Sequence, residues 1–154
     1  MRKDRLLGVP HEQGIAAIAR VIQLAIAPVF LLSGVSAMLG VLSHRLSRII
    51  DRGRLLEGRL AEAAVEKQAT LRQELGVLAR RARLVNRAIA LCTMCALLVC
   101  AVIISLFVGA FFGADVSYVI GVVFVAALTS LAGGLVIFLR EITLATRSLR
   151  IGPQ

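Results

Sequence analysis

The side chains best suited to chemistry are three cysteines, which lie close together in one apolar run. Cys92 and Cys95 are three residues apart and share a helical face, and Cys100 lies about 80° from Cys92. Thiolates bind soft metals such as Cu(I). However, no histidine or acid lies nearby, and a closed metal site usually needs more ligands. We therefore predict that the cysteines pack as small apolar side chains, with no metal and no cofactor.

The remaining candidates for catalysis are dispersed. His11 and His44 stand at opposite ends of the first apolar segment, and the three aspartates are Asp4, Asp51 and Asp115. No nucleophile is paired with a base, and no glycine-rich phosphate loop follows a strand. The sequence therefore predicts that the chain is not an enzyme.

The elements that position these residues are long apolar segments. Of the 154 residues, 58% are hydrophobic, whereas soluble domains contain roughly 45–50%, and the mean hydropathy is +0.87. Residues 21–43, 88–114 and 116–139 are free of charge, and each is long enough to span a membrane. We predict an all-α integral membrane protein with three transmembrane helices.

The distribution of charge predicts the orientation of the spans. Residues 44–87 carry 11 Lys and Arg against 5 acids, the tail 140–154 carries three Arg and one Glu, and the turn at Asp115 has no basic residue. The positive-inside rule places the insert and the tail in the cytoplasm and residues 1–20 outside. Four basic residues in that first segment run against this orientation. Cleavage of a signal peptide after Val35-Ser36-Ala37 is an alternative, but the basic insert argues against its translocation.

The insert 44–87 lacks proline and is rich in residues that favour helix. Its apolar positions repeat every three and four residues, as in a coiled-coil seam. We predict two antiparallel arms with a turn near Val65–Gln68, and the alternative is one long helix that pairs between subunits. The repeating positions are Leu46, Ile49, Gly53, Leu56 and Leu60 in the first arm, and Leu71, Leu75, Leu78, Ala82 and Val85 in the second.

One face of the first span forms a stripe that continues into the arginines of the insert. In a ring of subunits this stripe could line a pore, with an amide at the outer end and Phe30 as a hydrophobic constriction. The alternative is an ordinary packing face of small residues. The stripe consists of Gln23, Ala27, Phe30, Gly34, Ala37 and Val41.

A basic collar is predicted where the spans meet the cytoplasm. Such a collar attracts anionic lipid headgroups, and no fold motif supports binding to nucleic acid. We predict that Glu141 pairs with Arg83 or Arg87, because the second and third spans are antiparallel neighbours. Small residues predict close helix packing at Gly109, Gly113, Ser130 and Gly134. The collar consists of Arg45, Arg48, Arg52, Arg80, Arg83 and Arg87.

Several segments resemble a bacterial membrane family known as domain-of-unknown-function family 2721. The resemblance spans about residues 15–151 and implies a small multi-pass protein of the bacterial inner membrane, without an activity or a cofactor. It is carried by residues 27–32, 45–55, 80–83, 86–89 and 140–145.

Two functions follow from these patterns. The first is a homo-oligomeric ion channel lined by the first span. The second is a non-conducting structural or regulatory protein, whose cytoplasmic hairpin binds a partner or anionic lipid. The sequence names no protein partner.

Overall fold

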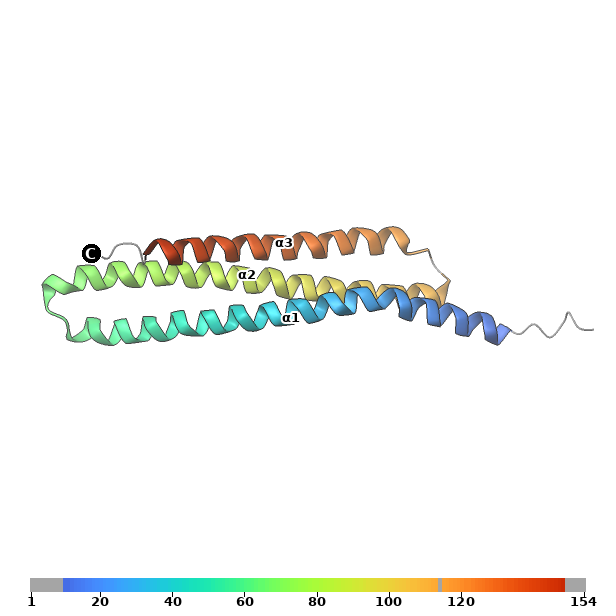
Figure 1. Cartoon of the computed structure of the whole chain (residues 1–154), viewed down its shortest axis with the longest axis horizontal. Helices are drawn as coiled ribbons and strands as arrows, with labels where there is room; N and C mark the ends of the chain where they lie inside the picture. Colours follow the sequence, from blue (N-terminus) through green and yellow to red (C-terminus); the bar gives the residue numbers. More distant parts are fainter. Residues whose placement is uncertain (1–9, 114, 149–154) are drawn as a thin grey trace, which may run out of the picture.

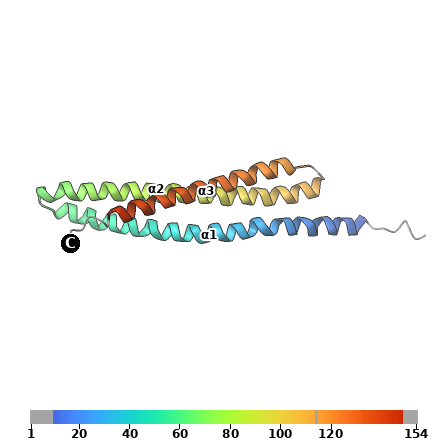
Figure 2. The same ribbon diagram turned by 45° about the horizontal axis from the view of Figure 1, so that its top comes forward.

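The computed structural model describes residues 10–113 and 115–148, which form three helices. They are α1 (Pro10–Glu62), α2 (Val65–Phe112) and α3 (Ser117–Ser148). Figure 1 shows them side by side along one long axis, with α2 antiparallel to both α1 and α3, and in the turned view of Figure 2 α3 runs obliquely across α2. All three are long and apolar enough to cross a membrane. The predicted all-α class with three candidate spans is confirmed.

Two of the helices are much longer than a span requires. α1 has 53 residues and α2 has 48, which correspond to about 80 and 72 Å at 1.5 Å per residue. The hydrocarbon core of a membrane is only about 30 Å thick. Each helix therefore continues without a break from its apolar segment into the basic insert. We call residues 44–87 the basic hairpin.

The two arms of the basic hairpin are joined by Ala63 and Ala64. The predicted turn at Val65–Gln68 was wrong by two residues, because α2 already begins at Val65. The amide of Lys67 donates a hydrogen bond to the carbonyl of Ala64 (2.9 Å), and the Gln68 side chain donates to the carbonyl of Ala63 (3.2 Å). These bonds close the first turn of α2 directly after α1 ends. Within the chain as described, the two arms pack against each other.

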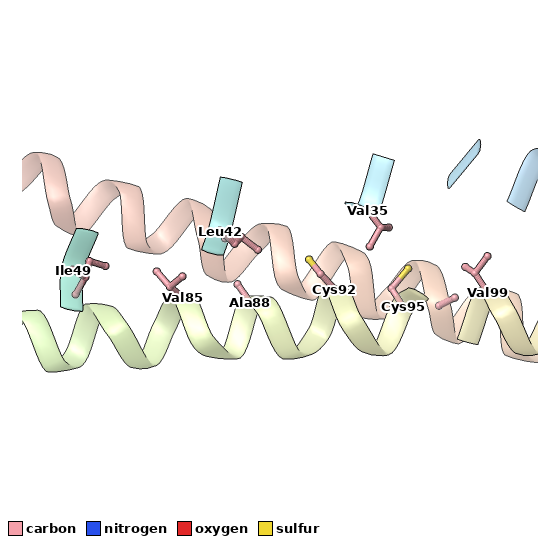
Figure 3. Close-up of a cluster of buried hydrophobic side chains, with 9 residues drawn as sticks. Val35, Leu42, Ile49, Val85, Ala88, Cys92, Cys95 and Val99 are labelled. Atoms are coloured by element: carbon pink, nitrogen blue, oxygen red, sulfur yellow. The ribbon is translucent and has the colours of Figure 1, made fainter. Parts of the chain in front are cut away.

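A repeat of seven residues determines which side chains are buried. Seven residues make nearly two helical turns, so the repeat forms one continuous face. In Figure 3, side chains of α2 point toward those of α1 along this face. All ten predicted apolar positions of the basic hairpin are buried or half-buried. The buried positions of the repeat include Val21, Pro28, Val35, Leu42, Ile49 and Leu56 in α1, Val85, Ala88, Cys92, Cys95, Val99 and Val102 in α2, and Ala127, Gly134 and Glu141 in α3.

Small residues bring α2 and α3 together, as predicted for Ser130 and Gly134. A Cβ atom on Gly134 would lie 3.2 Å from the Cys92 sulfur and 3.4 Å from the Ala88 carbonyl oxygen. The Ser130 hydroxyl donates a hydrogen bond to the carbonyl of Leu91 (2.9 Å). Gly109 of α2 is buried as well. The two backbones approach closely because no larger side chain stands between them.

Gly113 has a different role from the packing that was predicted. It ends α2 with φ +62°, and a Cβ there would meet no atom of the described residues within 4 Å. A left-handed residue at a helix C-terminus is typically glycine, because other residues are strained there. Beyond it, the amide of Ser117 donates to the Asp115 carboxylate (3.1 Å) and so begins α3.

Candidate functional site

The most unusual polar feature is a fully buried carboxylate, that of Glu141 on α3. Arg81 of α2 donates two hydrogen bonds to its Oε1, from Nε (3.0 Å) and Nη2 (2.9 Å). Arg45 of α1 places Nη2 3.0 Å from Oε2. The three residues, which we call the Glu141 cluster, join all three helices at one level. A buried carboxylate is tolerated only with such partners.

The seven-residue repeat explains why these side chains meet. Glu141 lies seven residues after Gly134, on the face of α3 that packs against α2. Arg81 lies seven residues before Ala88, on the face of α2 that is buried throughout its span. Arg45 lies one turn beyond Leu42 of α1. The cluster is therefore the point where the apolar contact between the helices becomes charged.

The predicted partners of Glu141 were wrong, because Arg83 and Arg87 are both exposed. Arg87 lies six residues beyond Arg81, or about 9 Å along the helix. Arg83 is close to the right level, but it is turned about 200° from Arg81 and faces away. The sequence did hold a signal for Arg81, since the repeat of Val85 and Ala88 continues backward to it.

The two arginines are held differently. Two N–H groups of Arg81 donate hydrogen bonds to one oxygen of the carboxylate, and hydrogen bonds between oppositely charged groups are strong. The Oε2 atom facing Arg45 makes no hydrogen bond with the described residues, so this contact is an ion pair only. The Arg45 guanidinium also lies 5.4 Å from the centre of the Phe138 ring, within range of a cation–π contact. Their side chains remain 33% (Arg45) and 22% (Arg81) exposed, whereas Glu141 has no exposed surface.

The predicted basic collar divides into two parts. Arg80, Arg83 and Arg87 are exposed on α2, and none of them borders a pocket that lies between the two arms. The arginines of α1 instead border a pocket of about 500 Å³ beside the Glu141 cluster. We call it the basic pocket, and its lining residues are His44, Arg45, Arg48, Ile49, Arg52, Leu78 and Arg81.

The predicted stripe of α1 lies on a face that α2 and α3 leave uncovered. All six of its residues, from Gln23 to Val41, are exposed, and Phe30 is 73% exposed. The buried face of α1 is the seven-residue repeat that begins at Val21. Phe30 also borders an apolar groove of about 450 Å³ between α1 and α2. In the chain as described, the stripe is free to contact lipid or another subunit.

The cysteines lie on two sides of α2. Cys92 and Cys95 are buried at the helix contact, while Cys100 is exposed. Figure 3 shows Cys92 and Cys95 in line with Ala88 and Val99, among apolar neighbours. Within residues 10–113 and 115–148, no group of three His, Cys, Asp or Glu side chains could hold a metal ion.

The fold and this site define a class, namely a helical membrane protein with three candidate spans and a charged cluster that joins its helices. The chain belongs to the family described as protein of unknown function DUF2721, whose model matches residues 25–151. The matched range includes all three residues of the Glu141 cluster. Comparison with curated proteins and with solved structures gave no match.

Proposed function

We propose that the protein is a structural or regulatory protein of a bacterial inner membrane, in which the spans orient the basic hairpin toward a cytoplasmic protein partner. The observation that carries this proposal is the Glu141 cluster. Its buried carboxylate contacts arginines of two other helices where the apolar segments end. A displacement of α3 in the membrane would have to break these ion pairs or move both arms of the hairpin with it.

The surface of the basic hairpin supports a role in binding a partner. Its arms expose large apolar side chains beyond the Glu141 cluster, and Val65 at the tip is 84% exposed. Apolar side chains that remain exposed outside the membrane favour protein contacts. The exposed apolar residues of the hairpin are Ile50, Leu55, Val65 and Val77.

In vivo photo-crosslinking tests this function. A photoreactive residue is placed at Val65 or Val77, and the control carries it at Tyr118, which is 83% exposed at the opposite end of the molecule. We expect discrete protein adducts from both hairpin positions and none from Tyr118. The proposal fails if the hairpin positions give no adduct, or if Tyr118 gives the same adducts.

A second function, an oligomeric channel lined by α1, is favoured by the uncovered stripe. In a ring of subunits, Gln23 would supply an amide at one end, Phe30 an apolar constriction, and Arg48 and Arg52 positive charge at the other end. A constriction of this kind gates by excluding water. The three helices of one chain leave the stripe on their outer surface, so this function requires several copies.

Two measurements test the channel. Native mass spectrometry gives the number of subunits, and ion flux into reconstituted vesicles is compared for Phe30→Ala and Leu24→Ala. Leu24 is 56% exposed on the same helix but lies about 100° away from the centre of the stripe. We expect a ring of four or more subunits and raised flux for Phe30→Ala alone. A monomer or dimer, or background flux in both variants, contradicts the channel.

A further inference from the structure

The basic pocket is suited to bind a negatively charged group. Four arginines and a histidine border its volume of about 500 Å³, and no carboxylate is among its lining residues. Glu141 lies behind two of the arginines and compensates only part of their charge. The pocket therefore concentrates positive charge between α1 and α2.

The four arginines fall into two pairs. Arg45 and Arg81 are held in place by Glu141. Arg48 and Arg52 lie one helical turn apart on α1 and are exposed, and neither forms an ion pair within the ranges 10–113 and 115–148. Their N–H groups are available to a ligand. The guanidinium of an arginine can donate two parallel hydrogen bonds to two oxygens of one phosphate group. A ligand with a single carbonyl or amide oxygen cannot accept both bonds in this way.

The level of the pocket indicates where such a group comes from. His44 and Arg45 directly follow the uncharged residues 21–43, and Glu141 lies two residues after the third apolar segment ends at Leu139. This is the depth at which an apolar span gives way to lipid headgroups. Ile49 and Leu78 add an apolar wall to the pocket.

We propose that the basic pocket binds a phosphate group, supplied by the headgroup of an anionic phospholipid. Arg48 and Arg52 make the principal contacts, and Arg45 and Arg81 complete the site in positions fixed by Glu141. This site is independent of the function proposed above, since it requires neither a protein partner nor a pore.

Native mass spectrometry of the protein in a neutral detergent tests the site, with phosphatidylglycerol as the probe. The variant Arg48→Gln/Arg52→Gln is compared with Arg83→Gln/Arg87→Gln, which removes the same charge from exposed positions outside the pocket. We expect the first variant to lose about 30-fold in affinity and the second no more than about threefold. All four positions are exposed, so both variants should keep the thermal transition of the parent protein.

Two results would overturn the proposal. Equal losses in the two variants would mean diffuse attraction to the whole collar. Equal affinity of the parent protein for phosphatidylcholine would mean that negative charge is not recognised. Competition with glycerol 3-phosphate, a soluble phosphate ester, shows whether the phosphate group comes from a lipid or from a soluble molecule. If glycerol 3-phosphate fails to displace phosphatidylglycerol at millimolar concentration, the lipid is the ligand, whereas displacement at micromolar concentration overturns the lipid assignment in favour of a soluble phosphate ester.

Discussion

Substitutions in the Glu141 cluster should destabilise the protein unequally. Arg81→Leu leaves a carboxylate with no exposed surface facing Arg45 alone, and that contact is not a hydrogen bond. Removing one partner of a buried ion pair costs about 3–5 kcal/mol. We therefore expect Arg81→Leu to lower the free energy of unfolding by that amount.

Removing the charge of the carboxylate should lower the free energy of unfolding by less than removing Arg81. In Glu141→Gln the uncharged amide still accepts a hydrogen bond from Arg81. The two arginines, 33% and 22% exposed, can turn toward water or lipid phosphates. We expect a loss of about 1–2 kcal/mol, because solvent screens much of the lost attraction.

The assay is equilibrium unfolding of detergent-solubilised protein by SDS, followed by far-UV circular dichroism. Arg87→Gln is the matched control, since Arg87 is exposed and distant from Glu141, and it should change stability by less than about 0.5 kcal/mol. A double-mutant cycle between Arg81 and Glu141 should give a coupling of about 1.5–3 kcal/mol. The reasoning is refuted if Arg81→Leu is neutral, or if Arg87→Gln is as costly as Arg81→Leu.

Three further predictions concern the helix contacts and the turn. Gly134→Val should cost about 1–3 kcal/mol in the same assay, because its Cβ meets Cys92 and Ala88, whereas Gly121→Ala, in open space, should not destabilise. Hydrogen bonds from the side chain and backbone of Ser117 lower the pKa of Asp115, so any stability from this turn is present above the unfolded pKa and is lost as pH falls through the folded one. NMR titration should show that Ser117→Ala raises this pKa, and an unchanged pKa would contradict the hydrogen bond. A lipophilic maleimide should modify exposed Cys100 before buried Cys92 and Cys95, and mass spectrometry of timed digests would detect the opposite order.

The sequence predicts the helices well because two strong patterns coincide. The uncharged segments mark the spans, and the repeat through Ile49 and Leu56 marks the contact between the arms. Both depend on local spacing alone. The turn was misplaced by two residues because Ala63 and Ala64 favour helix as much as their neighbours do, and only the hydrogen bonds around them show where the chain reverses.

The site was harder to predict because it depends on how the helices face one another. Four arginines lie within residues 80–87, and the choice among them depends on which face of α2 meets α3. The stripe from Gln23 to Val41 shows the same difficulty. Stepping along a helix identifies a face, but it does not show what covers that face. Arg45 on α1 approaches Glu141 on α3 because both helices pack against α2. The spacing of residues within one helix does not indicate such an arrangement.

The Glu141 cluster also explains how the helices find their alignment. A contact that repeats every seven residues and is made of small apolar side chains could form almost as well after a slide of seven residues. Such a slide of α3 along α2 would place Glu141 opposite Ala88 in one direction, where the carboxylate is buried without a partner. In the other direction it would place Glu141 opposite Glu74, where like charges repel. Only the observed alignment brings Arg81 to the carboxylate, so we infer that the Glu141 cluster selects one register from several apolar ones.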